Sequence, residues 1–249
     1  MRVSIGVVAF TVADDFNNFF ASVGKSTNSK IESLAEEHNF VLHENAFTPK
    51  CFPTSEQFTF NYVDCKQIAD VINAMPSNKA PGIDKVQTRV LKDSLLITLP
   101  FITSIINASL IASTFPEVWK TAEITPIPKQ GNHELPYNNR PISLLPALSK
   151  VCERVAYNQF VTNLTTKERL TTKQSGNKKW FYIETSLIHT TDAFLKGIDD
   201  KKLTTCVLLD MSKAFDSVDH QILLRKIQSV GASTSALINN YWMRLSMIS

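Results

Sequence analysis

Two aspartates stand at positions where a carboxylate could hold a metal ion. Asp210 ends the apolar run 203–209, whose length and branched side chains predict a buried strand. A carboxylate at the end of such a strand lies at a sheet edge, where its oxygens suit Mg²⁺, a hard cation that keeps several waters. Asp216 follows past a turn-prone stretch, and it either faces the same cleft or caps the next helix. Because an Asp after a strand is more often a cap or turn residue, both interpretations of Asp210 stay open.

Two cations flank a predicted turn earlier in the chain. The segment 123–129 has the pattern of a strand, and its two prolines restrict it to a sheet edge. A second strand is expected over 139–145, after the turn that starts at 130–132. The resulting hairpin brings Lys129 and Arg140 near each other. A planar Arg fork beside a Lys point charge suits a polyphosphate, and two solvated surface cations are the alternative interpretation.

Charge is unevenly distributed along the chain. Residues 1–75 hold five Lys and Arg against nine Asp and Glu, whereas residues 76–180 hold fourteen against seven. Residues 181–249 are balanced, with seven of each. The stretch 170–182 also combines three lysines with the aromatic run Trp180-Phe181-Tyr182, a composition that suits stacking on single-stranded nucleic acid. The basic middle region therefore favours an acidic partner such as nucleic acid or a triphosphate, with a solvated surface as the alternative.

The elements that must position these residues are mostly helices. Gly24 is expected to end one helix and Pro100 to begin another. The region 25–60 is polar and has the composition of a linker, with a short helix over 29–37. A short strand is expected at 58–60. The spacing of apolar residues predicts helices over 12–24, 64–75, 86–97, 100–112, 146–163, 184–197, 220–230 and 233–245.

Composition excludes several other classes of protein. The 249 residues are enough to bury a sizeable core. The four cysteines are far apart in the sequence, so they do not predict a zinc site. No apolar run reaches the roughly 18 residues that a membrane span needs, and the first residues lack the apolar core of a signal peptide. We expect an intracellular protein of the cytoplasm or nucleus that does not bind a membrane.

Five short motifs occur in one order between residues 79 and 216, and together they resemble the reverse transcriptase of a non-LTR (LINE-like) retrotransposon. The helix around 16–20 also resembles the segment that links the endonuclease to the reverse transcriptase in such elements. The motifs are Lys79-Ala80-Pro81-Gly82-Ile83-Asp84, Trp119-Lys120, Pro126-Ile127-Pro128-Lys129-Gln130-Gly131, Asn139-Arg140-Pro141-Ile142-Ser143-Leu144-Leu145 and Asp210-Met211-Ser212-Lys213-Ala214-Phe215-Asp216.

This resemblance implies a helix-rich α+β fold, the fingers and partial palm of a right-hand polymerase. The fingers would run over about 76–180 and the palm over about 181–249, after an N-terminal linker or extension over 1–75. The implied partners are an RNA template, a DNA primer and deoxynucleotide triphosphates, with Mg²⁺ as cofactor. The resemblance also assigns roles to single residues: Asp210 is the catalytic carboxylate and metal ligand, the Met211 carbonyl adds a ligand, Phe215 packs under the sugar, and Lys129 and Arg140 hold the triphosphate.

The sequence also departs from the family pattern. The family carries an aromatic-Ala-Asp-Asp turn downstream of the first catalytic carboxylate, and no such turn follows Asp216. The thumb and the endonuclease are missing too, so we expect a truncated domain. Because a two-metal reaction needs more than one carboxylate, this chain alone is expected not to polymerise DNA. The alternative is a non-catalytic nucleic-acid-binding remnant. A phosphohydrolase centred on Asp210 is disfavoured, since Met211 and Ser212 add no acids beside it.

Overall fold

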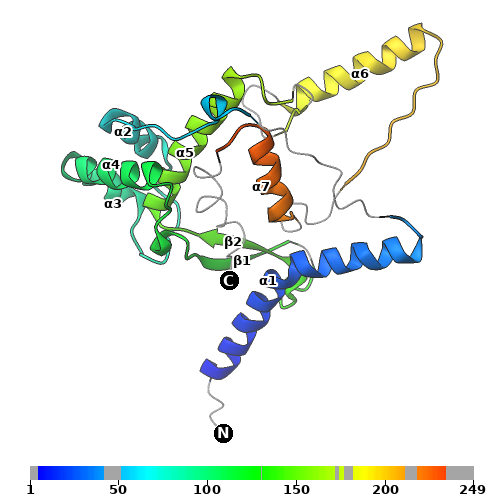
Figure 1. The fold of residues 1–249 in the computed structure, drawn as a ribbon. Helices are drawn as coiled ribbons and strands as arrows, with labels where there is room; N and C mark the ends of the chain where they lie inside the picture. The colour runs from blue at the N-terminus through cyan, green and yellow to red at the C-terminus, as the bar shows by residue number, and fades with distance from the viewer. Residues whose placement is uncertain are drawn as a thin grey trace. The chain divides into compact units, whose positions relative to one another are not determined.

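The described part of the chain is mostly helical, with one two-stranded sheet, so the prediction of a helix-rich fold is confirmed (Figure 1). The structure is a computed structural model. It divides into two compact units, which we call unit 1 (1–163 and 215–249) and unit 2 (164–214). No helix of the described residues combines the length and the apolar surface that crossing a bilayer requires. The residues described are 5–41, 52–129, 131–171, 174–176, 182–210 and 218–233.

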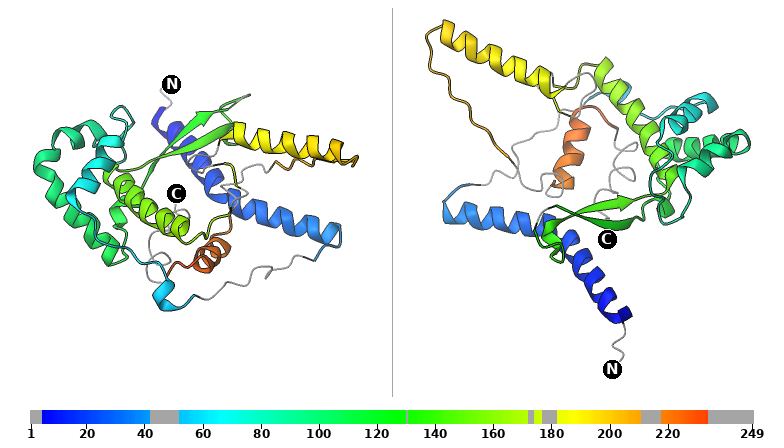
Figure 2. Two further views of the ribbon diagram at one scale, coloured as in Figure 1. Left: turned by 90° about the horizontal axis from the view of Figure 1, so that it is seen from above. Right: turned by 180° about the vertical axis from the view of Figure 1, so that it is seen from behind.

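Four helices form the core of unit 1, and they gather together in both views of Figure 2. Helix α2 packs on α3 and α4. Helix α5, which ends in unit 2, meets α4 where the Cys152 thiol lies 3.8 Å from the Ser109 hydroxyl. The helices span Cys65–Ala74 (α2), Thr88–Asp93 (α3), Leu95–Ile111 (α4) and Ala147–Thr166 (α5). Residues three or four apart share a helix face, and those facing the core include Ile68, Ile72, Ile106, Leu110, Val151 and Cys152.

The start of α2 is fixed by side chains on both sides of it. The Asp64 carboxylate accepts the backbone N–H of Gln67 at 2.7 Å, and the Gln67 side chain accepts the N–H of Asp64 at 3.0 Å. This reciprocal arrangement satisfies two backbone donors of the first turn. The Asn107 amide of α4 also pairs with both the N–H and the carbonyl of Val63, each at 2.8 Å. The helix predicted over 64–75 is therefore confirmed and is tied to α4.

A proline lies inside α4. The sequence predicted helices over 86–97 and 100–112, with Pro100 at the start of the second. The structure instead ends α3 at Asp93 and runs α4 through Pro100. Pro100 has no N–H to donate to the carbonyl of Leu96, one turn earlier. The Leu96 side chain is 94% exposed, so water can reach this turn and the missing bond is tolerated on this side of the helix.

The first helix is longer than its glycine predicts. The helices expected over 12–24 and 29–37 are a single helix, α1 (Ile5–Glu37), and Gly24 lies inside it. A glycine in a helix interior costs about 1 kcal/mol relative to alanine. Val23, its neighbour, is 4% exposed, and burial of such a side chain offsets that cost. Propensity alone therefore gave the wrong end for this helix.

The sheet of unit 1 is an antiparallel hairpin of β1 (Glu123–Pro128) and β2 (Asn139–Leu144), which confirms the two predicted strands. The Lys129 N–H donates to the Asn138 carbonyl at 2.8 Å, so these two residues form a hydrogen-bonded pair. Hydrogen-bonded and non-hydrogen-bonded pairs alternate along an antiparallel ladder. In the observed register, three prolines fall in non-hydrogen-bonded pairs, where the ladder needs no N–H: Pro126, Pro128 and Pro141.

Phe58 joins segments from both ends of unit 1. Its N–H donates to the Gly231 carbonyl at 2.7 Å, and its carbonyl accepts the Ser233 N–H at 3.2 Å. Its ring packs on Phe60 and Phe160, with centroids 5.1 and 5.2 Å away. The strand predicted at 58–60 is thus reduced to a single bridge beside a buried aromatic cluster.

Helix α7 (His220–Ser229) confirms the helix predicted over 220–230. The Asp219 carboxylate accepts the N–H of Ile222 at 2.9 Å and so caps its first turn. The helix predicted over 233–245 lies outside the described residues except for its first position. The other short elements are 3₁₀ turns: η1 (Thr54–Glu56), η2 (Glu117–Trp119) and η3 (Pro136–Asn138).

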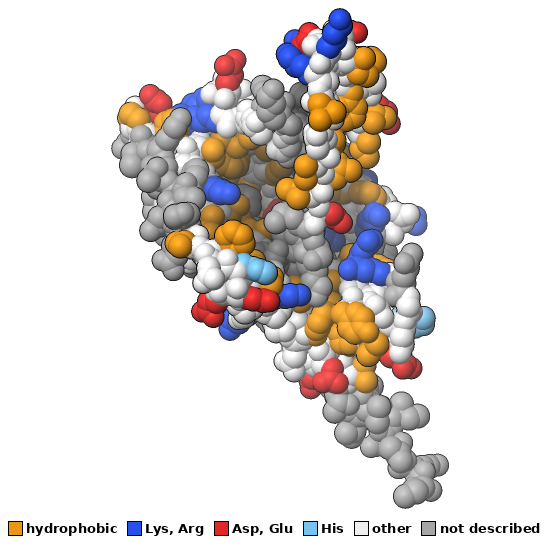
Figure 3. Space-filling view, turned by 90° about the vertical axis from the view of Figure 1, so that its right-hand side faces the viewer, with side chains coloured by type: hydrophobic (Ala, Val, Ile, Leu, Met, Phe, Trp, Pro, Cys, Tyr) orange, Lys and Arg blue, Asp and Glu red, His pale blue; other side chains and the backbone are white. Residues whose placement is uncertain are grey.

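Unit 2 contains α6 (Ile183–Asp199), which continues past the end that Gly197 predicted, and an extended segment over 202–210. The prediction of a buried strand over 203–209 is wrong: this segment is exposed, with Leu203 at 97% and Leu208 at 89%. A strand is stable only when a neighbouring strand pairs with its backbone, and no described residue of unit 2 supplies one. Apolar side chains of this unit therefore lie open at the surface (Figure 3).

Candidate functional site

Lys129 and Arg140 lie on the same face of the β1–β2 hairpin. Arg140 is directly opposite Ile127 in the register, and Lys129 follows Ile127 by two residues. Because side chains alternate across a strand, all three point to one side, which we call the open face. Lys129 and Arg140 are then diagonal neighbours, a relationship in which residues lie about 7–8 Å apart and their Cβ atoms somewhat closer. Both cations are exposed, and among the described residues neither pairs with a carboxylate.

The connection between the strands is held by three asparagines. The Asn139 amide donates to the carbonyls of His133 and Leu135, both at 2.9 Å. The Asn138 amide donates to the Asn132 carbonyl at 2.7 Å. Asn139 is 5% exposed and belongs to the hairpin face opposite Arg140. The described part of this connection, 131–138, is therefore folded back on itself by side-chain hydrogen bonds, and its turn η3 contacts α1.

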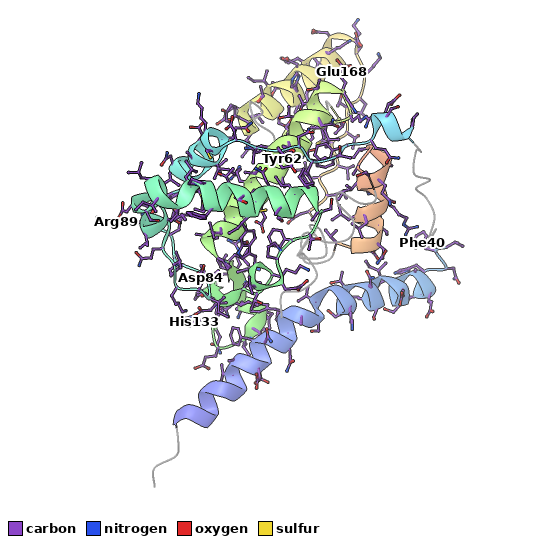
Figure 4. The ribbon with its side chains drawn as sticks, turned by 60° about the vertical axis from the view of Figure 1, so that its left-hand side comes forward. Phe40, Tyr62, Asp84, Arg89, His133 and Glu168 are labelled. Atoms are coloured by element: carbon purple, nitrogen blue, oxygen red, sulfur yellow. The ribbon has the colours of Figure 1, made fainter. Side chains whose placement is uncertain are left out.

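The loop before α3 is fastened to the same hairpin. Lys85 forms an ion pair with Glu123, the first residue of β1. The Gly82 backbone packs against the peptide bond between Leu145 and Pro146, just after β2. Figure 4 labels Asp84 in this loop and His133 in the hairpin connection. Two of the sequence motifs, Lys79–Asp84 and Asn139–Leu145, are thus in direct contact within unit 1.

A pocket of about 950 Å³ lies between the end of α2, the loop before α3, and α5. Three cations line it, Lys79 from the loop and Lys150 and Arg154 from one face of α5. The Arg154 guanidinium carbon lies 5.8 Å from the ring centre of Tyr157, within cation–π range. The remaining lining residues are Asp70, Val71, Ala74, Met75, Pro76, Thr88, Glu153 and Asn158.

The predicted catalytic carboxylate stands in the other unit. Asp210 ends the exposed segment of unit 2, whereas Lys129 and Arg140 belong to unit 1. Met211, Phe215 and Asp216 lie outside the described residues. Within the ranges that the structure describes, no three Asp, Glu, His or Cys side chains gather at a place that could hold a metal ion. A two-metal site needs several carboxylates, so the described residues do not by themselves fit one.

Sequence reasoning missed the residues that hold the hairpin connection. Asn132 belongs to the predicted turn and Asn139 to a motif, and neither pattern predicts their hydrogen bonds. Asparagine is favoured in turns because its side chain can hydrogen-bond nearby backbone groups. Three asparagines within eight residues were therefore a usable signal for a braced turn. The pocket beside α5 had no comparable signal, because its cations come from segments far apart in the sequence.

The comparisons with known proteins agree with the motifs. Residues 127–248 match the family described as reverse transcriptase (RNA-dependent DNA polymerase). The probable RNA-directed DNA polymerase from transposon BS of Drosophila melanogaster is 32% identical over 203 residues, 75% of this chain and 22% of that protein. The RNA-directed DNA polymerase from mobile element jockey of the same species is 29% identical over 175 residues, 70% of this chain and 19% of that protein.

A third relative comes from a different insect. The retrovirus-related Pol polyprotein from type-1 retrotransposable element R2 of Popillia japonica is 27% identical over 155 residues, 61% of this chain and 20% of that protein. The chain thus spans about a fifth of the length of the curated relatives it matches. The resemblance inferred from five short motifs is confirmed, and the chain belongs to the reverse transcriptase family of non-LTR retrotransposons.

Proposed function

We propose that the open face of the β1–β2 hairpin binds the triphosphate of the incoming deoxynucleotide in an RNA-directed DNA polymerase. The observation that carries this proposal is the placement of Lys129 and Arg140, which are diagonal neighbours on one exposed face. Neither cation is paired with an acid in the described part of the chain, so both are available to an anionic ligand.

Arg140 and Lys129 can bind different phosphate groups of one polyphosphate. The Arg140 guanidinium presents a planar fork of N–H donors that matches two oxygens of one phosphate group. The Lys129 ammonium adds a point charge that can follow a neighbouring phosphate. In phosphoryl transfer, cations around the phosphates also stabilise the charge that develops on the leaving pyrophosphate. The pair therefore suits both binding of the nucleotide and stabilisation of its leaving group.

The wider assignment follows the family. We propose fingers over about 76–180, the start of a palm over about 181–249, and an N-terminal extension over 1–75. Asp210 would be the first catalytic carboxylate, with the Met211 carbonyl beside it and Phe215 under the sugar. The family's divalent ions would supply charge neutralisation at the reacting phosphate. Because Asp210 offers only one carboxylate, we propose that the 249-residue chain alone binds nucleotide without transferring it.

Calorimetric titration of the chain with a deoxynucleoside triphosphate tests the binding step. Arg140→Ala and Lys129→Ala are each expected to raise Kd about 10- to 100-fold, because each removes a hydrogen bond to a charged group. Arg89→Ala and Lys30→Ala are the matched controls, since they remove exposed cations from α3 and α1. The parent nucleoside, which lacks phosphates, is expected not to bind. Equal affinity in all four variants would refute the proposal.

Primer extension on an RNA template tests the second part. The chain is expected to give no extended product with Mg²⁺ and all four deoxynucleotides. Asp210→Asn serves as the comparison, because it removes the charge and keeps the shape of the side chain. If the unchanged chain synthesises DNA and Asp210→Asn abolishes this synthesis, the proposal that the chain binds nucleotide without transferring it is refuted.

A second candidate function is RNA binding without chemistry, favoured by the pocket beside α5. Its three cations and the Tyr157 ring are groups that neutralise phosphates and stack on bases. RNA affinity is then expected to fall steeply with salt, to survive Asp210→Ala, and to weaken in Lys150→Ala and Arg154→Ala. Filter binding at two salt concentrations measures this, with Arg89→Ala as control. Affinity that is insensitive to both α5 substitutions would exclude this pocket.

A further inference from the structure

We infer that Asn139 is a positioning residue, whose buried amide sets where Lys129 and Arg140 stand relative to each other. This inference rests on the proposed function, because it concerns the same nucleotide site. Asn139 precedes Arg140 on β2, yet its side chain belongs to the opposite face of the hairpin. It is 5% exposed, so it does not itself meet a ligand on the open face.

The first step of the argument is what the amide holds. Both hydrogens of the Asn139 Nδ2 group are used, one on the His133 carbonyl and one on the Leu135 carbonyl, each at 2.9 Å. These two carbonyls lie in the middle of the strand connection. The buried Asn139 side chain on β2 therefore fixes the backbone of the connection between β1 and β2. An apolar side chain at this position would leave both carbonyls without these donors.

The second step links the amide to Lys129. The Leu135 carbonyl that accepts from Asn139 also accepts the Asn138 N–H, at 3.0 Å. The Asn138 carbonyl in turn accepts the Lys129 N–H at 2.8 Å. A continuous set of hydrogen bonds thus runs from the Asn139 amide through Leu135 and Asn138 to the backbone of Lys129.

The third step is that Asn139 is covalently joined to the other cation. Arg140 follows it directly and lies opposite Ile127 in the register. Through the peptide bond on one side and the hydrogen bonds on the other, the Asn139 amide determines both ends of the diagonal Lys129–Arg140 pair. Two long, exposed side chains bind one polyphosphate best when their backbones are held at a fixed spacing. Loss of this amide is therefore expected to weaken the joint binding of the polyphosphate by the two cations.

The test compares nucleotide affinity in two Asn139 variants with that in a variant that is destabilised in α5. Asn139→Leu keeps the branched shape of the side chain and removes both donors, and Asn139→Ala removes most of the side chain as well. Val151→Ala is the control, because Val151 is fully buried in α5 and its truncation lowers the unfolding temperature without removing any hydrogen bond of the hairpin. Kd for a deoxynucleoside triphosphate is measured well below the lowest unfolding temperature. We expect about a tenfold rise in Kd for both Asn139 variants, equivalent to about 1.4 kcal/mol, and no change for Val151→Ala.

Two further readouts separate positioning from general loss of stability. Hydrogen exchange at the Lys129 amide is expected to accelerate in Asn139→Leu and to stay unchanged in Val151→Ala. Adding Lys129→Ala to Asn139→Leu is expected to cost much less affinity than Lys129→Ala costs alone, because coupled residues are not additive.

The outcomes are distinguishable. If the unchanged chain binds no triphosphate, the proposed function falls and this inference falls with it. If the unchanged chain binds and Asn139→Leu binds equally well, the proposed function stands and the positioning role of Asn139 is refuted. Fully additive effects of the Asn139 and Lys129 substitutions would also refute it.

Discussion

The backbone of Gly82 lies against the carbonyl carbon of Leu145, so closely that a Cβ on Gly82 would stand 2.4 Å from that atom. The same Cβ would also lie 2.4 Å from the nitrogen of Pro146. The loop before α3 is therefore packed tightly against the junction between β2 and α5. The φ angle of Gly82 lies outside the left-handed region, so its backbone conformation does not require glycine. Glycine is needed here because the two backbones approach so closely.

Gly82→Ala is therefore expected to be strongly destabilising. Rotation of a side chain cannot relieve a clash between a methyl group and backbone atoms. Overpacking of this kind costs about 1–3 kcal/mol, occasionally more. Gly176→Ala is the matched control, because a Cβ there would meet nothing within 4 Å. Urea unfolding of the two variants checks this, and equal midpoints would show that the loop yields easily.

Two neighbouring isoleucines of α4 should differ sharply in their contribution to stability. Ile106 is fully buried and Ile105 is 47% exposed. Ile106→Ala is expected to lower the free energy of unfolding by about 2–5 kcal/mol, because it leaves a cavity in the core. Ile105→Ala is expected to cost much less, and calorimetric unfolding temperatures compare the two. A larger loss at Ile105 would mean that the exposed face of α4 is covered in solution.

Removal of the α2 cap should have a moderate effect. Asp64→Ala removes the acceptor for the Gln67 N–H and is expected to cost about 1 kcal/mol. Asp70→Ala, on the same helix, removes an exposed acid that caps nothing and is expected to change stability by less than about 0.5 kcal/mol. Urea denaturation midpoints at neutral pH measure both. The account of the cap fails if the two variants unfold at the same midpoint.

Pro100→Ala should stabilise the chain. Alanine restores an N–H that can bond to the Leu96 carbonyl, and it relieves the clash of the proline ring with the preceding turn. A proline in a helix interior costs about 3 kcal/mol or more relative to alanine, partly offset by the greater freedom of alanine in the unfolded chain. A rise in the unfolding temperature is expected. A fall would show that the local path of α4 depends on the proline.

The sequence predicted the elements whose signals are local. The helices α2 and α7 were predictable because the spacing of apolar residues over 64–75 and 220–230 is a local signal. The hairpin was predictable because proline, glycine and asparagine restrict the backbone where they stand. Gly24 gave a wrong helix boundary because burial of Val23 offsets its low propensity, and Pro100 gave one because the bond it lacks falls on a turn that water can reach.

The remaining features depend on partners that a local pattern does not contain. The apolar run before Asp210 has the composition of a buried strand, but a strand also requires a neighbour that pairs with it. Among the site residues, the motifs identified Lys129 and Arg140 and the register shows that they share a face. The amide of Asn139 could be recognised only from the two carbonyls that fold back onto it.

The prolines of the hairpin have a consequence for contacts between molecules. In a non-hydrogen-bonded pair the backbone N–H points away from the partner strand, toward the outer edge of the sheet. On the outer edge of β1 these positions are Ile124, Pro126 and Pro128, so only Ile124 has a donor to offer. A strand from another molecule that approached this edge would find too few donors to extend the ladder. Pro126 and Pro128 thus protect this edge of the hairpin from edge-to-edge aggregation while leaving its own pairing intact.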